Sequence, residues 1–302
     1  MTARPLVSVI VVACNSSRYV RDTLDSVLAQ TYDRLELIVT DDASTDDTVS
    51  IAERWLSVHG SRFVSSSVVR SAVNTGIAGN CNRALARAGG EWIKLIAADD
   101  LLLPDCLELG IRQAAFEPAA AVIFSRMKTI DEHGELRGEY AYPASFFAYP
   151  PERQLRHLLH RNCLAAPTAL IRMTDLGEMG LFDEDYPMLE DLPLWVKMLE
   201  RGKRLSGLAV PTVCYRVHQS LVYPVIGKRN KRYQQSVADW DKRVRLPLAR
   251  RLSPLLYATV GVDLLVDYIV QRRWLYRLSF PVLWVWARYS PYRVTAKQQP
   301  DA

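Results

Sequence analysis

Several features that mark particular classes of protein are missing from this sequence. Its five cysteines are Cys14, Cys81, Cys106, Cys163 and Cys214. They lie far apart, form no C-x-x-C pair and are odd in number, which argues against both a zinc site and a disulfide framework. No internal repeat or low-complexity segment is present. This cysteine usage predicts a reducing compartment.

Long hydrophobic runs are missing as well. The N-terminal apolar run stops at Asn15, too short for a membrane span, and fits a buried strand better than a signal peptide. Near the C-terminus, Asp263 and Asp267 interrupt one apolar stretch, and Pro281 with its flanking arginines limits another. With 49% hydrophobic and 24% charged residues, the 302-residue chain can still bury a sizeable core. The sequence therefore predicts a cytoplasmic, globular protein.

The charge of the chain is distributed unevenly. The net charge is +5, but residues 227–302 carry 15 Lys or Arg against 5 Asp, a balance of +10, which leaves −5 for residues 1–226. This C-terminal segment also contains Trp274, Trp284 and Trp286 among its arginines, a mixture suited to a lipid headgroup region. We expect it either to pack on the core as a helical subdomain or to contact a membrane peripherally. Nucleic acid is not expected as a partner.

Short apolar runs alternate with segments of helical periodicity in the first half of the chain. Strand and helix in alternation predict an α/β domain whose mostly parallel sheet is flanked by helices, with ligands bound at the carboxyl ends of the strands. A dinucleotide oxidoreductase shares this alternation but needs a G-x-G-x-x-G after the first strand, where "ACNSSR" stands instead. The predicted strands are 6–13, 35–40, 62–69, 91–98 and 120–127, and the predicted helices are 19–30, 46–57, 80–88, 151–162 and 190–202.

Pairs of carboxylates follow two of these strands. Asp41 and Asp42 end the second strand in "VTDDASTDD", and Asp99 and Asp100 end the fourth in "AADDLLLPD". Since the ends of parallel strands lie at one edge of a sheet, these acids are expected to converge. One carboxylate could then bind a base or ribose while another binds the divalent cation that a diphosphate leaving group requires.

Simpler explanations exist for the acids that follow Asp42. Asp46 and Asp47 stand where a helix begins, a position that favours capping and negative charge. The same stretch has the ligand spacing of an EF-hand loop, but Asp47 occupies the position that requires Gly, and the preceding run is β-rich. Capping is therefore the preferred interpretation of these two residues.

The quoted acidic motifs belong to a longer series. "VSVIVVACN", "TLDSVLAQTYDRLELIVTDDASTDDT", "NTGIAGNCNRALARAGGEWIKLIAADDLLLPD" and "EDLPLWVKMLERG", followed by "VCYRVH", appear in this order over about residues 5–220. Together they resemble glycosyltransferase family 2, the inverting, nucleotide-sugar-dependent enzymes of the GT-A fold. The resemblance implies a nucleotide-sugar-binding half at 1–128, an acceptor-binding and catalytic-base half at 129–224, and a basic helical extension at 225–302.

For the donor site, the resemblance implies contacts with the nucleotide. Asp42 looks like the residue that binds the uracil of a UDP-sugar, and Asn15 lines the base pocket. Cys14 stands where relatives often carry Tyr. Asn74 and Gly76 in "NTGIAGN" look like a turn under the nucleotide, in which Gly76 permits a tight backbone.

The metal motif is degenerate, because its usual first acid falls at Ala97. The resemblance then implies that Asp99 contacts the ribose or diphosphate and that Asp100 is a ligand of Mn²⁺ or Mg²⁺. His218 in "YRVH" matches a position near the metal and the diphosphate, although a structural His is the alternative. Arg216 either meets the diphosphate, as a substrate-binding residue, or packs.

The catalytic base is implied by "MLEDLPLW". Asp191 takes the place of the Asp that removes the proton from the acceptor hydroxyl, with Glu190 beside it at the substrate. From the residues alone, both could be first-turn acids of a helix. Inverting transfer is a single displacement, so it needs positioning, one proton acceptor and neutralisation of the leaving group.

The expected function is therefore transfer of a sugar from a nucleotide-sugar, with a UDP-sugar as the favoured donor, to a hydroxyl of a saccharide or lipid-linked acceptor. The resemblance places such an enzyme in bacterial surface polysaccharide biosynthesis, with peripheral contact at the inner face of the cell membrane through the C-terminal tail. The alternative is a non-catalytic nucleotide-binding or membrane scaffold protein that retains the fold.

Overall fold

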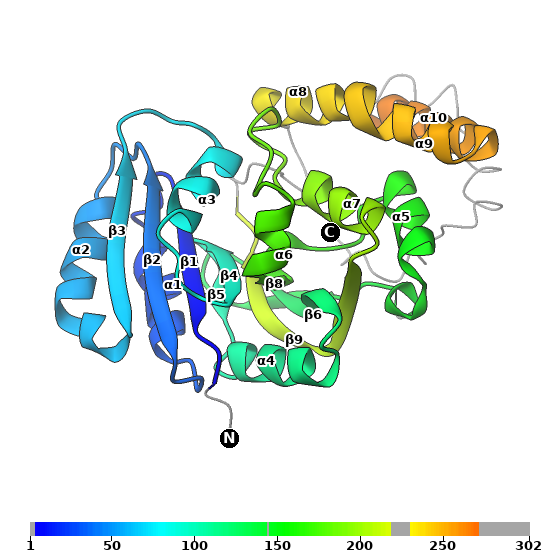
Figure 1. Ribbon diagram of the computed structural model, residues 1–302. Helices are drawn as coiled ribbons and strands as arrows, with labels where there is room; N and C mark the ends of the chain where they lie inside the picture. Colours follow the sequence, from blue (N-terminus) through cyan, green and yellow to red (C-terminus); the bar gives the residue numbers. More distant parts are fainter. Residues whose placement is uncertain (1–3, 144, 219–229, 272–302) are drawn as a thin grey trace.

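The computed structural model describes residues 4–143, 145–218 and 230–271, and one nine-stranded sheet forms its centre (Figure 1). The strands follow the order β3-β2-β1-β4-β8-β6-β9-β5, and β7 pairs with β6. Short 3-10 turns cover Gly60–Arg62, Phe146–Ala148 and Ala166–Thr168. The predicted α/β architecture is confirmed.

The first half of the sheet is parallel. It consists of β1 (Val7–Ala13), β2 (Leu35–Asp42), β3 (Ser65–Ser71) and β4 (Trp92–Ala97). In the register of these strands, Ala13 lies opposite Asp41 and Val12 lies opposite Ala97. The carboxyl ends of β2 and β4 therefore flank the end of β1, which is where the sequence placed its two acidic pairs.

The second half of the sheet is mixed, so the prediction of a mostly parallel sheet holds only for the first half. β8 (Leu170–Arg172) runs antiparallel to β4 and to β6 (Ala120–Ile130), whereas β9 (Arg204–Arg216) runs parallel to β6. The two-residue β5 (Leu101–Leu102) pairs antiparallel with β9. Because β6 continues through residue 128, both predicted halves share one sheet.

A hairpin joins β6 to β7 (Leu136–Tyr140), with its turn around His133 and Gly134. Gly134 has a φ of 89°, a left-handed backbone conformation that glycine adopts without steric cost. This turn brings Asp131 and Glu132 to the carboxyl end of β6.

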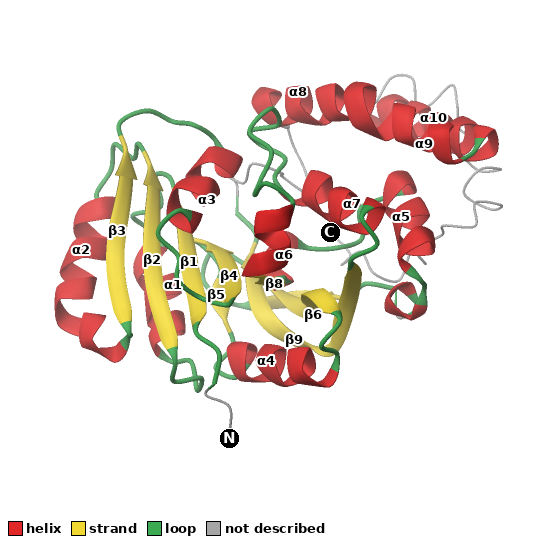
Figure 2. Ribbon diagram, viewed as in Figure 1, coloured by secondary structure: helices red, strands yellow, loops and turns green. Residues whose placement is uncertain are grey.

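Helices cover both faces of the sheet (Figure 2). One core joins the sheet to α1 (Val20–Leu28), α2 (Thr48–His59) and α4 (Cys106–Phe116). The other joins it to α3 (Ile77–Leu85), α5 (Pro151–His160), α6 (Met173–Glu178) and α7 (Asp191–Glu200). Alternation along β1 explains this division: Val9 and Val11 face the first core, and Ile10 faces the second.

The C-terminal extension is helical and packs on the second core. It comprises α8 (Lys231–Trp240), a π-helical turn (Asp241–Arg245), α9 (Leu246–Leu252) and α10 (Pro254–Gln271). Trp240 and Val260 are fully enclosed in this core. Packing on the core, one of the two expectations for this segment, is thus observed for its described part. The three tryptophans of the tail lie outside the described residues.

Candidate active site

The carboxylate of Asp42 holds the loop after β3 against the end of β2. Its Oδ1 accepts hydrogen bonds from the backbone N–H of Thr75 (2.9 Å) and from the Thr75 hydroxyl (2.8 Å). Its Oδ2 accepts one from the N–H of Gly76 (2.8 Å), and the Arg83 guanidinium lies 3.4 Å from Oδ1. Asp42 is 3% exposed, so these donors replace the water that a carboxylate would otherwise bind.

Asn74, from the same loop as Thr75, connects the loop after β1 to this place through Cys14. The Asn74 side-chain amide donates to the backbone oxygen of Asp42 (3.3 Å) and to the sulfur of Cys14 (3.4 Å). Cys14 is exposed, and partial burial together with the negative charge of Asp42 raises the pKa of its thiol. The loops after β1, β2 and β3 therefore meet around Asp42.

Asn15 orders the loop after β2 through its side chain. It adopts a left-handed backbone with a φ of 52°, and its Oδ1 accepts the backbone N–H of Thr45 (2.9 Å). Its own N–H donates to the Ser44 hydroxyl (2.7 Å). Asn15 is exposed, so it borders the surface next to Asp42.

Asp46 acts at the beginning of α2, as the capping interpretation predicted. Its carboxylate accepts the backbone N–H groups of Thr48 and Ser17, both at 3.0 Å. Burial alone would raise its pKa, but these hydrogen bonds lower the pKa of Asp46 to about 2. Asp46 thus stabilises the loop and the helix that begins there, whereas Asp47, at the N-cap position, makes no side-chain capping hydrogen bond.

At the end of β4, the structure pairs Asp99 with His218. His218 Nε2 lies 2.9 Å from Asp99 Oδ2, and the imidazole lies beside the Tyr19 ring, with centroids 5.3 Å apart. The side chain of Asp99 remains 24% exposed and that of His218 10% exposed. One carboxylate and one imidazole thus lie together at the carboxyl edge of the sheet.

Asp100 has a different environment from Asp99. It is 1% exposed, and its Oδ1 accepts the backbone N–H of Arg216 (2.8 Å). Burial raises the pKa of Asp100 well above its usual value, and the neighbouring charge of Asp99 adds to this effect. Asp100 therefore joins the end of β4 to the end of β9 inside the protein.

Arg216 is enclosed among backbone oxygens. Its guanidinium donates to the carbonyl oxygens of Asp99 (2.8 Å) and Asp131 (3.3 Å) and lies over the Tyr19 ring, 4.5 Å from the centroid. At 2% exposed, it holds the β6–β7 turn against the end of β4. Of the two expectations for Arg216, these contacts match packing.

A divalent cation fits the Asp99–His218 pair. Mg²⁺ is usually held by one or two carboxylates together with substrate phosphates, and imidazole nitrogen is a ligand that several transition metals accept. Within residues 4–143, 145–218 and 230–271, no group of three or more His, Cys, Asp or Glu is arranged to hold a metal. These residues therefore permit a metal ion that is held by two protein ligands together with an incoming diphosphate.

Glu190 and Asp191 stand at the beginning of α7. Asp191 Oδ2 accepts a hydrogen bond from the side-chain amide of Asn162 (3.0 Å), which follows α5. Burial raises the pKa of Asp191, although the Leu192 N–H and Asn162 partly oppose this effect. Burial and the charge of Asp191 raise the pKa of Glu190 to about 8. Two adjacent carboxyls thus share a poorly solvated site and do not ionise independently.

The loop before Glu190 brings this pair to the Asp42 region. The N–H of Ala78 donates to the Pro187 carbonyl (3.2 Å), and a Cβ added at Gly76 would lie 2.6 Å from that oxygen. On α3, burial raises the pKa of the Cys81 thiol, and the charges of Glu190 and Asp42 raise it further. The Pro187 carbonyl therefore links the Gly76 turn, which Asp42 holds, to the segment that leads to Glu190.

The geometry of the sheet relates Asp42 to Asp99. Since the ends of β2 and β4 are separated by β1, and adjacent strands lie about 4.8 Å apart, the two ends are roughly 10 Å from each other. A nucleoside diphosphate is long enough to contact both. The structure thus places Asn15, Asp42 and Asn74 at one end of a common edge and Asp99 and His218 at the other.

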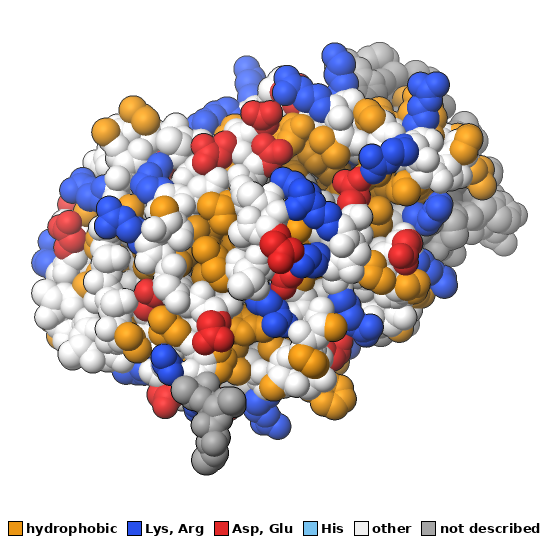
Figure 3. Space-filling view, in the orientation of Figure 1, with side chains coloured by type: hydrophobic (Ala, Val, Ile, Leu, Met, Phe, Trp, Pro, Cys, Tyr) orange, Lys and Arg blue, Asp and Glu red, His pale blue; other side chains and the backbone are white. Residues whose placement is uncertain are grey.

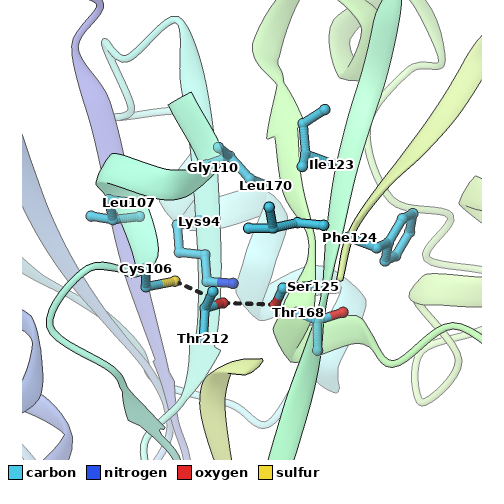
Figure 4. Close-up of a pocket in the computed structure, with 11 residues that line it drawn as sticks. Lys94, Cys106, Leu107, Gly110, Ile123, Phe124, Ser125, Thr168, Leu170 and Thr212 are labelled. Atoms are coloured by element: carbon cyan, nitrogen blue, oxygen red, sulfur yellow. Dashed lines mark hydrogen bonds between the residues drawn. The ribbon is translucent and has the colours of Figure 1, made fainter. Parts of the chain in front are cut away.

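None of the residues of this edge lines the internal cavity in Figure 4. It has a volume of about 10 Å³ and is lined by Lys94, Ser125 and Thr212 among others. Lys94 donates to the carbonyl oxygens of Pro167 (2.6 Å) and Ala169 (3.3 Å), and burial lowers its pKa. A more open hollow of about 330 Å³ at Phe116–Ala119 lies where β6 begins, opposite the acidic edge. Neither space belongs to the candidate active site.

Three residues of the site were missed in the sequence. Arg83 could have been found, because Gly76, Asn80 and Arg83 have the spacing of one helical face. Tyr19, which lies between Arg216 and His218, was assigned only to a helix. Asn162 carried no signal, since its contact with Asp191 joins segments 29 residues apart.

The comparisons with known proteins agree with this arrangement. The family model described as glycosyl transferase family 2 matches residues 8–178, more than half of the chain. The chain is 29% identical over 220 residues to UDP-Glc:alpha-D-GlcNAc-diphosphoundecaprenol beta-1,3-glucosyltransferase WfaP of Escherichia coli, covering 72% of this chain and 79% of WfaP. It is 27% identical over 215 residues to the putative teichuronic acid biosynthesis glycosyltransferase TuaG of Bacillus subtilis, covering 71% and 80%.

Solved structures show the same fold. S. aureus TarS 1–349 in complex with UDP-GlcNAc matches with a TM-score of 0.61 and 21% identity, covering 92% of this chain and 75% of that one. The mannosyltransferase PcManGT from Pyrobaculum calidifontis, in complex with GDP-Man and Mn²⁺, matches with a TM-score of 0.57 and 21% identity, covering 97% and 83%. In another TarS structure the chain spans only 37% of the protein.

The expected fold class, a GT-A domain with a helical C-terminal extension, is therefore confirmed, and so is the expected enzyme class. The chain belongs to glycosyltransferase family 2.

Proposed function

We propose that this glycosyltransferase moves a sugar from a UDP-sugar to a hydroxyl of a saccharide or lipid-linked saccharide, with inversion at the anomeric carbon. The observation that carries the proposal is the meeting of three acidic groups from distant parts of the chain. Asp42 holds Gly76, whose neighbour Ala78 donates to the carbonyl of Pro187, three residues before Glu190, and Asp99 lies two strands from Asp42. Asp191 follows Glu190 directly.

The donor end of the site is the edge formed by Asn15, Asp42 and Asn74. Loops from three strands meet here, and the fixed Asp42 carboxylate and nearby backbone groups offer acceptors to a base N–H or a ribose hydroxyl. The relatives WfaP and TarS support a uridine nucleotide, since UDP-Glc and UDP-GlcNAc stand in their names. The loop around Cys14 would border the base.

For the metal, we assign Asp99 and His218 as the residues that hold Mn²⁺ or Mg²⁺, and this assignment replaces the expectation for Asp100. Asp99 Oδ2 and His218 Nε2 are 2.9 Å apart and partly exposed, whereas Asp100 accepts the Arg216 N–H inside the protein. When bound, the cation would neutralise charge that develops on the departing diphosphate. Asp100 and Arg216 would support this edge by joining β4 to β9.

Asp191 would accept the proton of the attacking hydroxyl. In a single displacement, the acceptor oxygen forms a bond to the anomeric carbon while the bond from that carbon to the diphosphate oxygen breaks, and the proton passes to the base. The raised pKa of Asp191 makes it a stronger base than an ordinary carboxylate. Glu190, with a pKa of about 8, would hold a proton at neutral pH and could donate a hydrogen bond to the substrate.

The acceptor is proposed to be lipid-linked and reached from the cytoplasmic face of a membrane. On α10, Leu255, Val262 and Leu265 are exposed along one face, at 74%, 45% and 56%. The exposed cations Lys242 and Arg250 lie on the neighbouring helices, and Figure 3 shows Lys and Arg side chains along this edge of the molecule. An apolar face beside cations suits the headgroup region of an anionic bilayer. No described helix is both long and apolar enough to span a membrane.

The test of the proposed function separates binding from turnover. UDP would be titrated by calorimetry with and without Mn²⁺, and UDP release from a panel of UDP-, GDP- and dTDP-sugars would be measured with purified protein. We expect tighter UDP binding with Mn²⁺, and a large loss of UDP release in Asp191→Asn with unchanged UDP affinity. Asp105→Asn, which changes an acid before α4, serves as the control. UDP binding without turnover of any donor would favour the scaffold alternative.

A further inference from the structure

The C-terminal extension holds the end of α5. Arg245, which is 7% exposed, donates to the carbonyl oxygens of Leu159 and His160, both at 2.6 Å. These carbonyls belong to the last turn of α5, where no helical N–H is left to bond them. The side chain of His160 also pairs with Asp263 of α10. Two segments of the extension thus fix the point at which α5 ends.

The fixed end of α5 leads directly to the contact with Asp191. Arg161 continues in an extended conformation, and Asn162 follows it. The Asn162 amide donates to Asp191 Oδ2 (3.0 Å), and its Oδ1 accepts the backbone N–H of Leu164 (3.0 Å). Because the oxygen of the amide is already bonded, its nitrogen must face the carboxylate.

We propose that Asn162 is a positioning residue for Asp191, and that the C-terminal extension keeps it in place through Arg245. The inference rests on the proposed role of Asp191 as the base. Asn162 orients one carboxylate oxygen and stabilises its ionised form, so that the other oxygen remains directed to the acceptor hydroxyl. The extension thereby contributes to catalysis without contacting the substrate.

The surroundings of Asp191 make this contact important. The neighbouring titratable groups are Glu190, adjacent in the chain, and the Cys81 thiol on α3, which responds to the charge of Glu190. Neither is a cation. The groups that stabilise negative charge on Asp191 are the backbone N–H of Leu192, the Asn162 amide and the backbone N–H of Asp191 itself, so Asn162 is the side chain among them. Loss of Asn162 would therefore raise the pKa of Asp191 further.

The pH profile of turnover tests this role. Since only ionised Asp191 accepts the proton, kcat falls at low pH, and this acidic limb should move to higher pH in Asn162→Ala. We expect kcat at neutral pH to fall by about 10- to 100-fold, as for a misplaced catalytic group, with the KM for donor little changed. Asn162→Ser, which keeps a donor, should restore part of kcat. An Asn162→Ala enzyme with the wild-type acidic limb would overturn the proposal.

A measurement without turnover tests the same contact. A hydrogen bond to an ionised carboxylate is stronger than one to a protonated carboxyl. Because the pKa of Asp191 is raised from its ordinary value of 3.8, the carboxyl is protonated at pH 3, and Asn162→Ala should therefore lower the melting temperature more at pH 9 than at pH 3. In the Asp191→Asn background, this difference between the two pH values should vanish, although Glu190 still titrates there. Equal losses at both pH values in the protein that retains Asp191 would contradict the contact.

Arg245 is tested against a matched arginine. Arg172 also donates to two carbonyl oxygens, those of Pro118 (2.6 Å) and Ala120 (2.8 Å), at a distance from Asp191. Arg245→Lys keeps the charge but loses the two-pronged contact, so it should lower kcat and shift the acidic limb in the same direction as Asn162→Ala. Arg172→Lys should leave both unchanged. A shift in both variants, or in neither, would remove the extension from the proposal.

These outcomes separate this inference from the proposed function. If Asp191→Asn retains turnover, Asp191 is not the base, and the proposed function fails in that part. If Asp191→Asn is inactive while Asn162→Ala keeps the wild-type limb, only the positioning role fails.

Discussion

The two carboxylate sites of this enzyme are built in opposite ways. Asp42 accepts three short hydrogen bonds from Thr75 and Gly76, so its charge is satisfied before any ligand arrives. Asp191 has one side-chain donor, Asn162, and shares its site with Glu190, which lies under the same burial. A buried carboxylate costs free energy unless donors surround it, and the Glu190–Asp191 site, which offers fewer donors, resists ionisation.

This difference corresponds to two proposed tasks. A group that recognises a base or sugar should keep one orientation, which the loop donors at Asp42 provide. A group that accepts a proton should have a pKa close to the working pH, which burial and a like charge provide at Glu190–Asp191. This comparison can be tested by substitutions that remove the hydrogen bonds of the Asp42 site or the titratable groups of the Glu190–Asp191 site.

The largest effect on stability is expected from Asp42→Ala. The substitution leaves the N–H groups of Thr75 and Gly76 without their acceptor, and it removes the carboxylate that lies 3.4 Å from the Arg83 guanidinium. At roughly 1–3 kcal/mol for each unsatisfied buried donor, the free energy of unfolding should fall by about 4 kcal/mol. Urea denaturation would measure this loss. If the free energy of unfolding falls by less than 1 kcal/mol, roughly the value of one ordinary hydrogen bond, Asp42 does not hold the loop.

Gly76→Ala should act on both sites at once. Gly76 has a φ of 88°, and an added Cβ would lie 2.6 Å from the Pro187 carbonyl oxygen and 2.8 Å from its Cβ. Strain in the backbone and the displaced loop together should cost about 3 kcal/mol. Because this loop leads to Glu190, kcat should fall along with UDP affinity. Gly134→Ala, also at positive φ but with open space around it, is the control and should leave both unchanged.

Much of this arrangement could be predicted from the sequence. Strand ends marked by "TDD" and "AADD" placed the acids correctly, because a parallel sheet brings consecutive carboxyl ends to one edge. What could not be predicted depends on side-chain direction: adjacent Asp99 and Asp100 point to opposite environments, since one borders solvent and the other joins β9. The contacts of Asn162 and Arg245 could not be predicted either, because their partners are set by helix packing and not by a motif.

Glu190→Gln should change how stability depends on pH. The pKa of Glu190 rises from its ordinary value of 4.5 to about 8 on folding, so the folded state binds more protons between these pH values. Stability should therefore fall as pH rises from 4.5 to about 8, and this loss is complete above pH 8. Gln cannot ionise, so the variant should gain on the order of 2 kcal/mol over wild type at pH 9 relative to pH 5.

Denaturation at a series of pH values would measure this gain. Glu184→Gln, which changes another acid of the same loop, serves as the control and should show no comparable gain. Parallel pH dependences of wild type and Glu190→Gln would mean that Glu190 is solvated as an ordinary acid, and the contrast with the Asp42 site would disappear.

The smallest expected effect is a change in the reactivity of Cys14. This measurement tests directly whether UDP binds at the donor end of the site. Cys14 is exposed and contacts Asn74 and Asp42, whereas the other four cysteines are buried. The raised pKa of its thiol makes alkylation slow, and because the other cysteines are buried, alkylation is confined to Cys14 in the folded protein.

If UDP covers this loop, only the free protein reacts, so UDP at ten times its Kd should slow labelling about tenfold. Mass spectrometry after iodoacetamide treatment would follow the reaction, with Cys14→Ser as the unlabelled control. Labelling that proceeds at the same rate in saturating UDP would mean that the uracil base does not lie near Cys14 and Asp42. Asp42 would then not be the recognition site that the comparison with the proton-accepting Glu190–Asp191 site requires.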